Sequence, residues 1–319
     1  MNFFKTLILS LVLVASALAA PDKKITEIVI PWATGGTAAN LGNILNEALG
    51  ENDIPSVVVY KPGAESVIGA NYAARGATDG TTLFLGSTST LVGNTVFRPT
   101  GMEYSADSFV PIIPLGATGH VLVVPANSPI KNYQQFKFYV RANPEKFNMG
   151  LSAPSLAPLW KEWARREQLP EPNLIPYKGS AAVTTDLLGG QLLVMQDNWT
   201  STSVFLDAKR VRVIAAINDT VLQQVKSVDP ASEAVSISAV QPGLNFNIWF
   251  GLYAPTGTPK VTLDRINQIL NRTFQQPKYR EKLAATKLSG FGGPADALNK
   301  MQKTDTKTLH NIVNKNSGG

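Results

Sequence analysis

The sequence predicts an α/β protein. Apolar runs of strand length alternate along it with segments whose apolar residues recur at helical spacing, a pattern typical of parallel sheets covered by helices on both faces. Its 319 residues suit two domains or one large one. Because the chain has no cysteine, it forms no disulfide, iron–sulfur cluster or thiol nucleophile, and packing alone must stabilise it.

The first 19 residues are predicted to be a signal peptide, cleaved after export across a bacterial inner membrane. Lys5 precedes an apolar run at 7–14, and small residues follow up to Ala20. A membrane anchor is the alternative, but the run is shorter than the roughly 18 to 20 residues that span a bilayer. Cleavage is expected after Ala19, because the next bond would leave Pro21 directly after the cut. The expected location is the periplasm.

Seven apolar runs predict strands, and three apolar stripes predict helices. The strands are expected at 28–32, 57–60, 82–85, 121–124, 174–177, 192–195 and 211–217. The helical stripes are Leu41, Ile44, Leu45, Ala48 and Leu49, then Tyr133, Phe136 and Val140, and then Leu263, Ile266, Leu270 and Phe274.

No internal repeat or low-complexity linker marks a domain border. This absence indicates two lobes joined by strands that cross between them, and the β-rich segments 121–125 and 246–255 are the candidate crossings. The second crossing would return the chain to the first lobe. The predicted organisation is therefore a signal peptide over 1–19, a first lobe over 20–122, a second lobe over 123–247 and a return to the first lobe over 248–319.

The formal charge of +6 would suit nucleic-acid binding, but export argues against it. The basic residues are also dispersed, apart from short groups at 161–166 and 209–212, and no aromatic residues alternate with them in an RNA- or DNA-binding signature. No nucleic-acid partner is expected. A positive field instead raises the encounter rate with small anions.

The motifs of the common enzyme classes are missing. The two histidines, His120 and His310, have no spacing that builds a metal site or a catalytic triad, and a structural role is favoured for both. The sequence contains no G-x-S-x-G elbow and no Walker or dinucleotide glycine fingerprint. We therefore expect no enzymatic activity, no metal and no cofactor.

One local device recurs, a strand that runs into small residues at the start of a helix. The first example is Gly35-Gly36-Thr37, and similar turns are found at 86–90, 151–155 and 179–180. The free N–H groups of such a helix end carry partial positive charge and bind carboxylate or phosphate. An ordinary tight turn is the alternative for any one of them. Because clefts in α/β folds form at the carboxyl ends of strands, four such ends converging there would make an anion site.

Several motifs in order resemble the receptor family of tripartite tricarboxylate transporters, the Bug-type receptors. They are PGAESVIGA at 62–70, DGTTL at 79–83, PYKG at 176–179, DLLGGQ at 186–191, WFGL at 249–252 and APTGTP at 254–259. Together they cover essentially the whole mature chain. The resemblance implies a type II periplasmic-binding-protein fold whose two lobes close on a small organic carboxylate. It also implies delivery to a membrane permease of two subunits, and the receptor is expected to be monomeric.

The resemblance and the recurring turns together give a set of expected ligand-binding residues. They are Trp32, Gly35, Gly36, Thr37, Ala38, Ala39, Ser66, Ser87, Thr88, Ser152, Ala153, Ser155, Tyr177, Lys178 and Asp197. In the family, the paired-glycine loop and the loop facing it hold one carboxylate largely through backbone amides and ordered water.

Some of these residues have alternative interpretations. Trp32 either stacks on a ligand or belongs to the core or rim, and Lys178 either pairs with an anion or serves the turn and the surface. Asp197 either orients the ligand or caps the following segment. Trp160 and Trp163, three residues apart on one helix, favour packing. The role itself is also open, because a receptor for uptake and a sensor for a membrane signalling protein need the same closing lobes.

The sequence departs from the family pattern at three positions. Ala39 replaces a usual Asp, Tyr60 replaces a usual Asn, and Leu159 stands where the altered loop 151–159 usually carries a histidine. Pro154 and Pro158 in that loop have no N–H to donate. These changes predict a ligand less polar than citrate or an amino acid, such as an aromatic or medium-chain carboxylate, unless the altered loop faces solvent or high-affinity binding has been lost.

Overall fold

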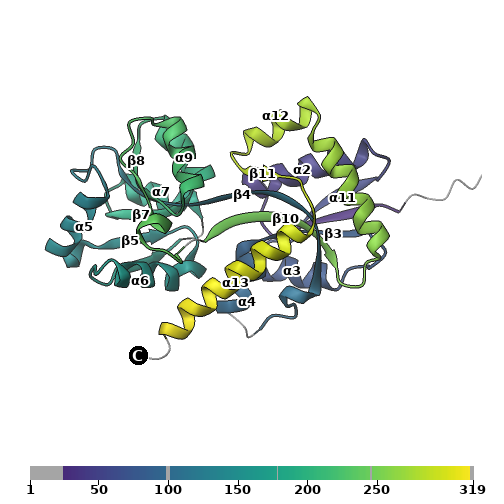
Figure 1. The fold of residues 1–319 in the computed structure, drawn as a ribbon, viewed down its shortest axis with the longest axis horizontal. Helices are drawn as coiled ribbons and strands as arrows, with labels where there is room; N and C mark the ends of the chain where they lie inside the picture. The colour runs from purple at the N-terminus through teal and green to yellow at the C-terminus, as the bar shows by residue number, and fades with distance from the viewer. Residues whose placement is uncertain (1–23, 98–100, 178, 245, 317–319) are drawn as a thin grey trace, which may run out of the picture.

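The computed structural model describes residues 24–97, 101–177, 179–244 and 246–316. The predicted signal peptide and Lys178 lie outside the described residues. Two α/β lobes lie side by side, joined by long strands (Figure 1). The predicted α/β class is confirmed.

The first lobe is built on a mixed sheet with the strand order β2-β1-β3-β10-β4. Its strands are β1 (Thr26–Ile30), β2 (Ser56–Tyr60), β3 (Thr82–Ser87), β10 (Asn247–Pro255), the first part of β4 (Phe109–Pro125) and β11 (Ser289–Phe291). Its helices are α2 (Gly36–Gly50), α3 (Val67–Ala74), α4 (Asn94–Phe97), α11 (Lys260–Phe274) and α12 (Pro277–Ala285), with short turns η1 (Ala64–Ser66), η2 (Ser89–Gly93) and η3 (Ala106–Ser108). Strands β1, β2 and β3 are parallel, whereas β10 is antiparallel to both of its neighbours.

The second lobe is built on strands that pair, directly or through one another, with the C-terminal part of β4. Its strands are β5 (Asn148–Leu151), β6 (Asn173–Pro176), β7 (Val194–Asn198), β8 (Val211–Ala216) and β9 (Val235–Ser236). Its helices are α5 (Tyr133–Ala142), α6 (Ala157–Arg166), α7 (Ser180–Leu188), α8 (Trp199–Asp207), α9 (Asp219–Val228) and α10 (Ile237–Val240), with turns η4 (Pro144–Lys146) and η5 (Pro154–Leu156). Strands β5, β6 and β7 are parallel, and β7 and β8 flank β4 in antiparallel pairing.

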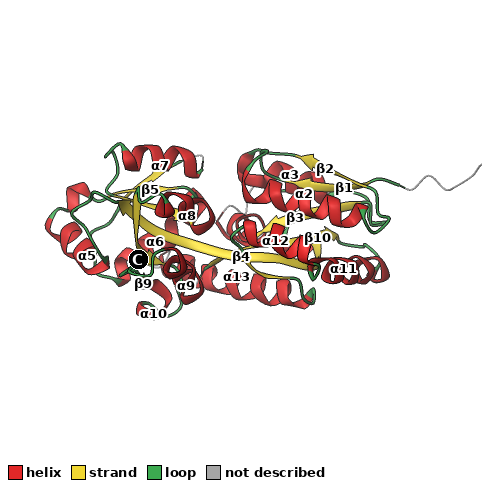
Figure 2. Cartoon of the chain, turned by 90° about the horizontal axis from the view of Figure 1, so that it is seen from above, coloured by secondary structure: helices red, strands yellow, loops and turns green. Residues whose placement is uncertain are grey.

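Strand β4 belongs to both lobes (Figure 2). Gly119 pairs with Asn247 of β10, and the next residue, His120, pairs with Asn198 of β7. The chain therefore passes between the sheets at Gly119 and His120. The C-terminal helix α13 (Asp296–Asn316) is a further link, because it packs against α4 of the first lobe and α6 of the second. The lobe boundaries predicted at 122/123 and 247/248 stay predictions.

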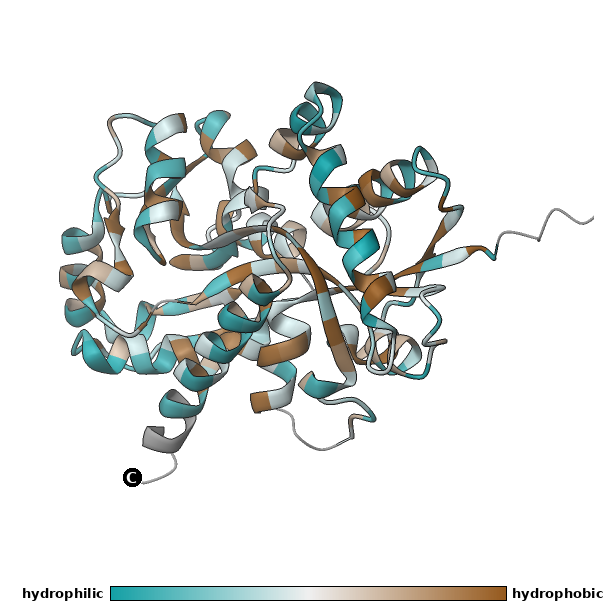
Figure 3. Ribbon diagram, turned by 45° about the vertical axis from the view of Figure 1, so that its right-hand side comes forward, coloured by the Kyte–Doolittle hydropathy of each residue, from teal (hydrophilic) through white to brown (hydrophobic). Residues whose placement is uncertain are grey.

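Hydrophobic residues gather along the strands and on the inward faces of the helices (Figure 3). The second lobe has an aromatic centre on α5 and α6, where Trp163 packs against Phe136, Phe147 and Trp160. Its indole N–H donates to the hydroxyl of Tyr133 at 2.9 Å. The packing role favoured for Trp160 and Trp163 agrees with their complete burial.

Six of the seven predicted strands are present within about three residues of their expected bounds, and the seventh, 121–124, is the end of the longer strand β4. Strands β5, β9, β11 and the first part of β4 were not predicted. The sheets were expected to be parallel, whereas β4 and β10 are antiparallel to their neighbours. In β5, Gly150 interrupts the apolar run, because a Cβ there would lie 2.5 Å from a methyl of Val183 and 2.6 Å from one of Leu192.

Candidate functional site

The paired-glycine loop lies between β1 and α2. Gly35 and Gly36 have φ angles of 91° and 75°, which a residue with a side chain rarely adopts. Gly35 is the N-cap of α2, and no side chain of the described residues caps this helix. The first N–H groups of α2 are therefore left without a side-chain acceptor at an exposed end of the helix, as an anion site requires.

The end of α2 faces the start of α8 across the two lobes. The hydroxyl oxygens of Thr37 and Thr200 lie 3.3 Å apart. Asn198 is the N-cap of α8, and its side chain accepts a hydrogen bond from the N–H of Ser201 at 3.2 Å. Two helix N-termini, one from each lobe, therefore meet at the carboxyl ends of β1 and β7.

A cluster of hydroxyl groups joins η1 to the loop after β3 in the first lobe. The Ser66 hydroxyl is 2.8 Å from that of Thr90, and the Ser87 hydroxyl is 2.9 Å from that of Ser89. Asn94 donates to the carbonyl of Glu65 at 2.9 Å. The backbone of η1 is left-handed, with φ 77° at Ser66, so this cluster holds a strained turn in place.

The loops of the second lobe are organised around Asp197, which is fully buried. Its carboxylate accepts from the hydroxyls of Ser180 at 2.6 Å and Thr202 at 3.3 Å. Burial raises the pKa of the Asp197 carboxyl, while hydrogen bonds from Ser180 and Ser152 oppose the rise. The N-cap of α8 is Asn198, so Asp197 is not the side chain that caps this helix. Asp197 joins the loops that carry Ser152 and Ser180.

Part of the loop after β5 is hydrogen-bonded within the second lobe. The N–H of Ser152 donates to the carbonyl of Gln196 at 3.2 Å, and the N–H of Ala153 donates to the side-chain oxygen of Gln196 at 3.3 Å. Ser155 instead faces the first lobe, since its hydroxyl oxygen lies 3.9 Å from where a Cβ on Gly93 would be.

Four other expected residues serve the surrounding structure. Trp32 packs edge-to-face on Phe250 with ring centroids 6.0 Å apart, and it lies against the core of the first lobe. Ala38 and Ala39 are buried on the inner face of α2. The hydroxyl of Thr88 accepts from the N–H of Trp249 at 2.8 Å.

Tyr177 is also engaged within its lobe. Its hydroxyl donates to Asp186 at 2.6 Å, and this bond raises the pKa of Tyr177 to about 12. The expected role of Lys178 falls on a residue outside the described part of the chain.

Leu159 requires a correction. It is 1% exposed and belongs to the hydrophobic core of the second lobe. It therefore adds no apolar surface to the loops, and the argument that it favours a less polar ligand is wrong. Of the other two departures used in that argument, Ala39 is 5% exposed, and Tyr60 is half-buried against the core of the first lobe.

Three polar residues at these loops were not predicted, namely Asn94, Asn198 and Thr200, and Ser89 and Thr90 were predicted only as part of the turn 86–90. A signal existed for two of them. Asn198 directly follows the apolar run of β7 and precedes a helix, the position where Asn is preferred as an N-cap. An N-cap at 198 places Thr200 in the first turn of α8, at its N-terminal end.

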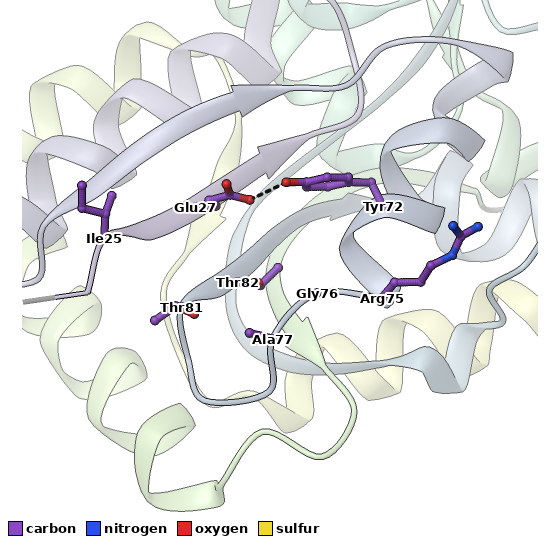
Figure 4. A pocket seen from close by; sticks show the side chains of 8 residues that line it. All are labelled: Ile25, Glu27, Tyr72, Arg75, Gly76, Ala77, Thr81 and Thr82. Atoms are coloured by element: carbon purple, nitrogen blue, oxygen red, sulfur yellow. Dashed lines mark hydrogen bonds between the residues drawn. The ribbon is translucent and has the colours of Figure 1, made fainter.

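A cavity of about 430 Å³ lies elsewhere in the first lobe, near the amino ends of β1 and β3. In Figure 4, the hydroxyl of Tyr72 points to Glu27 across it, and the two are joined by a hydrogen bond of 2.8 Å. Its other lining residues are Ile25, Arg75, Gly76, Ala77, Thr81 and Thr82. None of the expected ligand-binding residues that the structure describes lines it.

Residues 24–97, 101–177, 179–244 and 246–316 contain neither a metal-ligand cluster nor a membrane-spanning helix. No group of three or more His, Asp or Glu side chains there could hold a metal ion. Within the same residues, no helix combines the length and the apolar character needed to cross a membrane.

The model of the tripartite tricarboxylate transporter family receptor matches residues 40–317. The chain belongs to this receptor family. Its members are solute-binding receptors of the periplasm, and the expected fold is confirmed by solved structures of the family.

Relatives by sequence include a Pseudomonas sp. (strain P51) protein described as a UPF0065 protein in the tcbD-tcbE intergenic region. It is 29% identical over 301 residues, which cover 92% of this chain and 87% of that one. Protein BugT of Bordetella pertussis is 26% identical over 298 residues, covering 89% of each chain.

Among solved structures, a periplasmic transporter is 26% identical, with a TM-score of 0.78, and the match covers 93% of this chain and 98% of that one. The structure of Rpa4515 from R. palustris with adipate is 24% identical, with a TM-score of 0.76 and coverage of 92% and 97%. MatC from Rhodopseudomonas palustris with bound malate is 21% identical, with a TM-score of 0.71 and coverage of 92% and 99%. At these identities, the last two show the fold alone.

Proposed function

We propose that this protein is a periplasmic receptor that captures a small organic carboxylate and delivers it, as a monomer without enzymatic activity, to a membrane permease of the tripartite tricarboxylate type. The observation that carries the proposal is the approach of two helix N-termini from different lobes, with Thr37 and Thr200 at the meeting point. Both ends favour negative charge, so a carboxylate between them would draw the lobes together.

The ligand class is supported by the polar groups around that point. The surrounding loops, residues 33–38, 64–66, 87–94, 152–156 and 197–201, contain no lysine or arginine, and Lys178 is the one cation of the neighbouring loop 176–180. Recognition there would depend on N–H and O–H donors rather than on a charged pair. The adipate and malate bound by two structural neighbours are carboxylates and serve as probes for this chain.

The first prediction is that a carboxylate stabilises the protein and compacts it. A ligand that binds only the folded state adds roughly 2.7 kcal/mol at a hundredfold excess over its dissociation constant. Thermal-shift measurements with adipate, malate, citrate and benzoate should therefore raise the Tm with at least one acid. Small-angle scattering of that complex should show a smaller radius of gyration, because the lobes close on the ligand.

The control for this screen is the same panel of carbon skeletons as uncharged amides or alcohols, which offer no anion to the helix ends. Equal Tm shifts from acids and neutral analogues would contradict the anion site. Binding without any compaction would contradict closure between the lobes.

The second prediction separates the backbone of α2 from its side chains. Thr37→Pro removes one N–H from the first helical turn, where proline is tolerated, whereas Thr37→Val removes only the hydroxyl. Loss of a charge-assisted hydrogen bond costs about 1.5 to 3 kcal/mol, so Thr37→Pro should weaken binding roughly ten- to a hundredfold.

Calorimetry with the best acid of the panel measures this difference. Thr37→Val controls for the lost contact with Thr200, and Lys178→Ala tests the charge next to the second-lobe loop. If Lys178→Ala weakens binding as much as Thr37→Pro, the anion is held by charge rather than by the helix end.

A further inference from the structure

Trp249 connects three parts of the molecule. It lies in β10, which runs along the crossing strand β4, and it is fully buried. Its backbone N–H donates to the hydroxyl of Thr88 at 2.8 Å, and its indole N–H donates to the carboxylate of Asp305 on α13 at 2.7 Å. A continuous chain of two hydrogen bonds therefore runs from the C-terminal helix, through β10, to the loop after β3.

Asp305 differs from the other partners in this chain of bonds, because it is a carboxylate that is 5% exposed and has no cationic partner among the described residues. Among the described residues, the Trp249 indole is the one hydrogen-bond donor to its carboxylate. A cavity of about 430 Å³ borders it, lined by Gly243, Asn247, Trp249, Lys300, Met301, Thr304, Asp305 and Thr308. A buried carboxylate with one neutral donor is costly, since burial raises its pKa to about 7 while the indole bond opposes the rise.

The charged groups around Asp305 are engaged elsewhere. On α13, Lys300 pairs with Asp296 at 3.1 Å and is largely exposed. On α6, Arg166 lies near the cavity residue Gly243, but it binds Glu162 and the carbonyl of Pro242. On β4, burial lowers the pKa of His120 to about 3, which keeps this ring neutral. The described parts of α4 and η2 contribute no titratable side chain.

We propose that Asp305 is a positioning residue for the ligand site, acting through Trp249 on Thr88 and thus on the loop that carries Ser87 and Ser89. This inference rests on the proposed function, because it assigns ligand binding to that loop. Asp305 itself touches no ligand in this proposal. A change in its charge alters the acceptor of the indole N–H, and the loop follows because the same residue donates to Thr88. Affinity should therefore change with pH around neutrality.

The first test needs no ligand. In NMR spectra of the full mature protein, Trp249→Phe assigns the Trp249 indole resonance. That resonance and the amide resonances of Thr88 and Ser89 should titrate together between pH 5.5 and 8.5. In Asp305→Asn this shared titration should vanish, and in the control Thr304→Val, which changes an exposed residue of the same cavity, it should remain. If the indole titrates while the loop amides do not, Asp305 is structural only and the proposal is overturned.

The second test measures binding of adipate and malate between pH 6.5 and 8.5, where their carboxyls stay ionised, since such groups titrate near pH 4 to 5. The dissociation constant of the wild type should change by at least threefold over this range, and that of Asp305→Asn by less. Equal pH dependence in both proteins would overturn the proposal. If neither acid binds, the acid of the Tm panel that does bind takes their place. If no acid of that panel binds, the receptor proposal fails, and the NMR titration alone decides the role of Asp305.

Discussion

The free energy of unfolding of the wild type should fall as the pH rises from about 5 to 8, and Asp305→Asn should lack the part of this fall that comes from Asp305. The folded-state pKa is about 7 and the ordinary value is 3.8, so between these limits the folded chain binds a proton that the unfolded chain has released. Stability then falls with rising pH, by about 1.4 kcal/mol per unit, and the whole interval is worth about 4 kcal/mol at most. Asparagine does not titrate, so the variant lacks this slope.

Urea unfolding at pH 5 and pH 8, followed by both fluorescence and circular dichroism, measures the effect. The wild type should lose about 3 kcal/mol more than Asp305→Asn between the two pH values. Other titrating groups are present in both proteins and cancel in the comparison. Thr304→Val should behave as the wild type, and an identical pH slope in all three proteins would show that Asp305 is ionised in the fold without penalty.

Trp163→Ala should destabilise the second lobe by about 3 to 5 kcal/mol, the range for large aromatic residues removed from a core. The side chain is 1% exposed and is surrounded by Phe136, Phe147 and Trp160, which leave little room for the site to collapse. The substitution also leaves the buried hydroxyl of Tyr133 without its donor.

Chemical denaturation of the ligand-free protein measures this loss, and Trp163→Phe is the matched control. Phenylalanine keeps part of the ring volume but still deprives Tyr133 of the indole N–H, so its smaller loss separates packing from hydrogen bonding. A loss below about 1 kcal/mol for Trp163→Ala would be typical of a surface substitution and would contradict the assignment of this residue to the core.

The fold was predictable where a segment's own residues carry a clear period. The stripes of α2, α5 and α11 and the apolar runs of seven strands are local signals, and each reports burial directly. The first part of β4 contains Pro111, Pro114 and Gly116, which argue against a strand in a sequence. Its strand conformation depends on pairing with β10, which is more than a hundred residues away in the chain.

The candidate site was predictable at the level of loops but not of individual side chains. Paired glycines at 35 and 36 mark a helix start that no side chain caps. Burial, however, is decided by tertiary packing. Leu159 faces the core, and the hydroxyl of Thr88 accepts a hydrogen bond from the N–H of Trp249. The contact between Thr37 and Thr200 joins residues 163 positions apart, so it follows only from the arrangement of the two lobes.

The pairing of Gly119 with Asn247 means that everything between them enters and leaves the first lobe through two adjacent strands. Paired residues of neighbouring strands lie only about 4.5 to 5.5 Å apart, a gap that a tight turn spans. In topological terms, the second lobe is one long insertion in a β-hairpin. The hairpin could close without it, and the surfaces left uncovered would include the side of α13 that now packs on α6 and the turn η2 that now packs on η5.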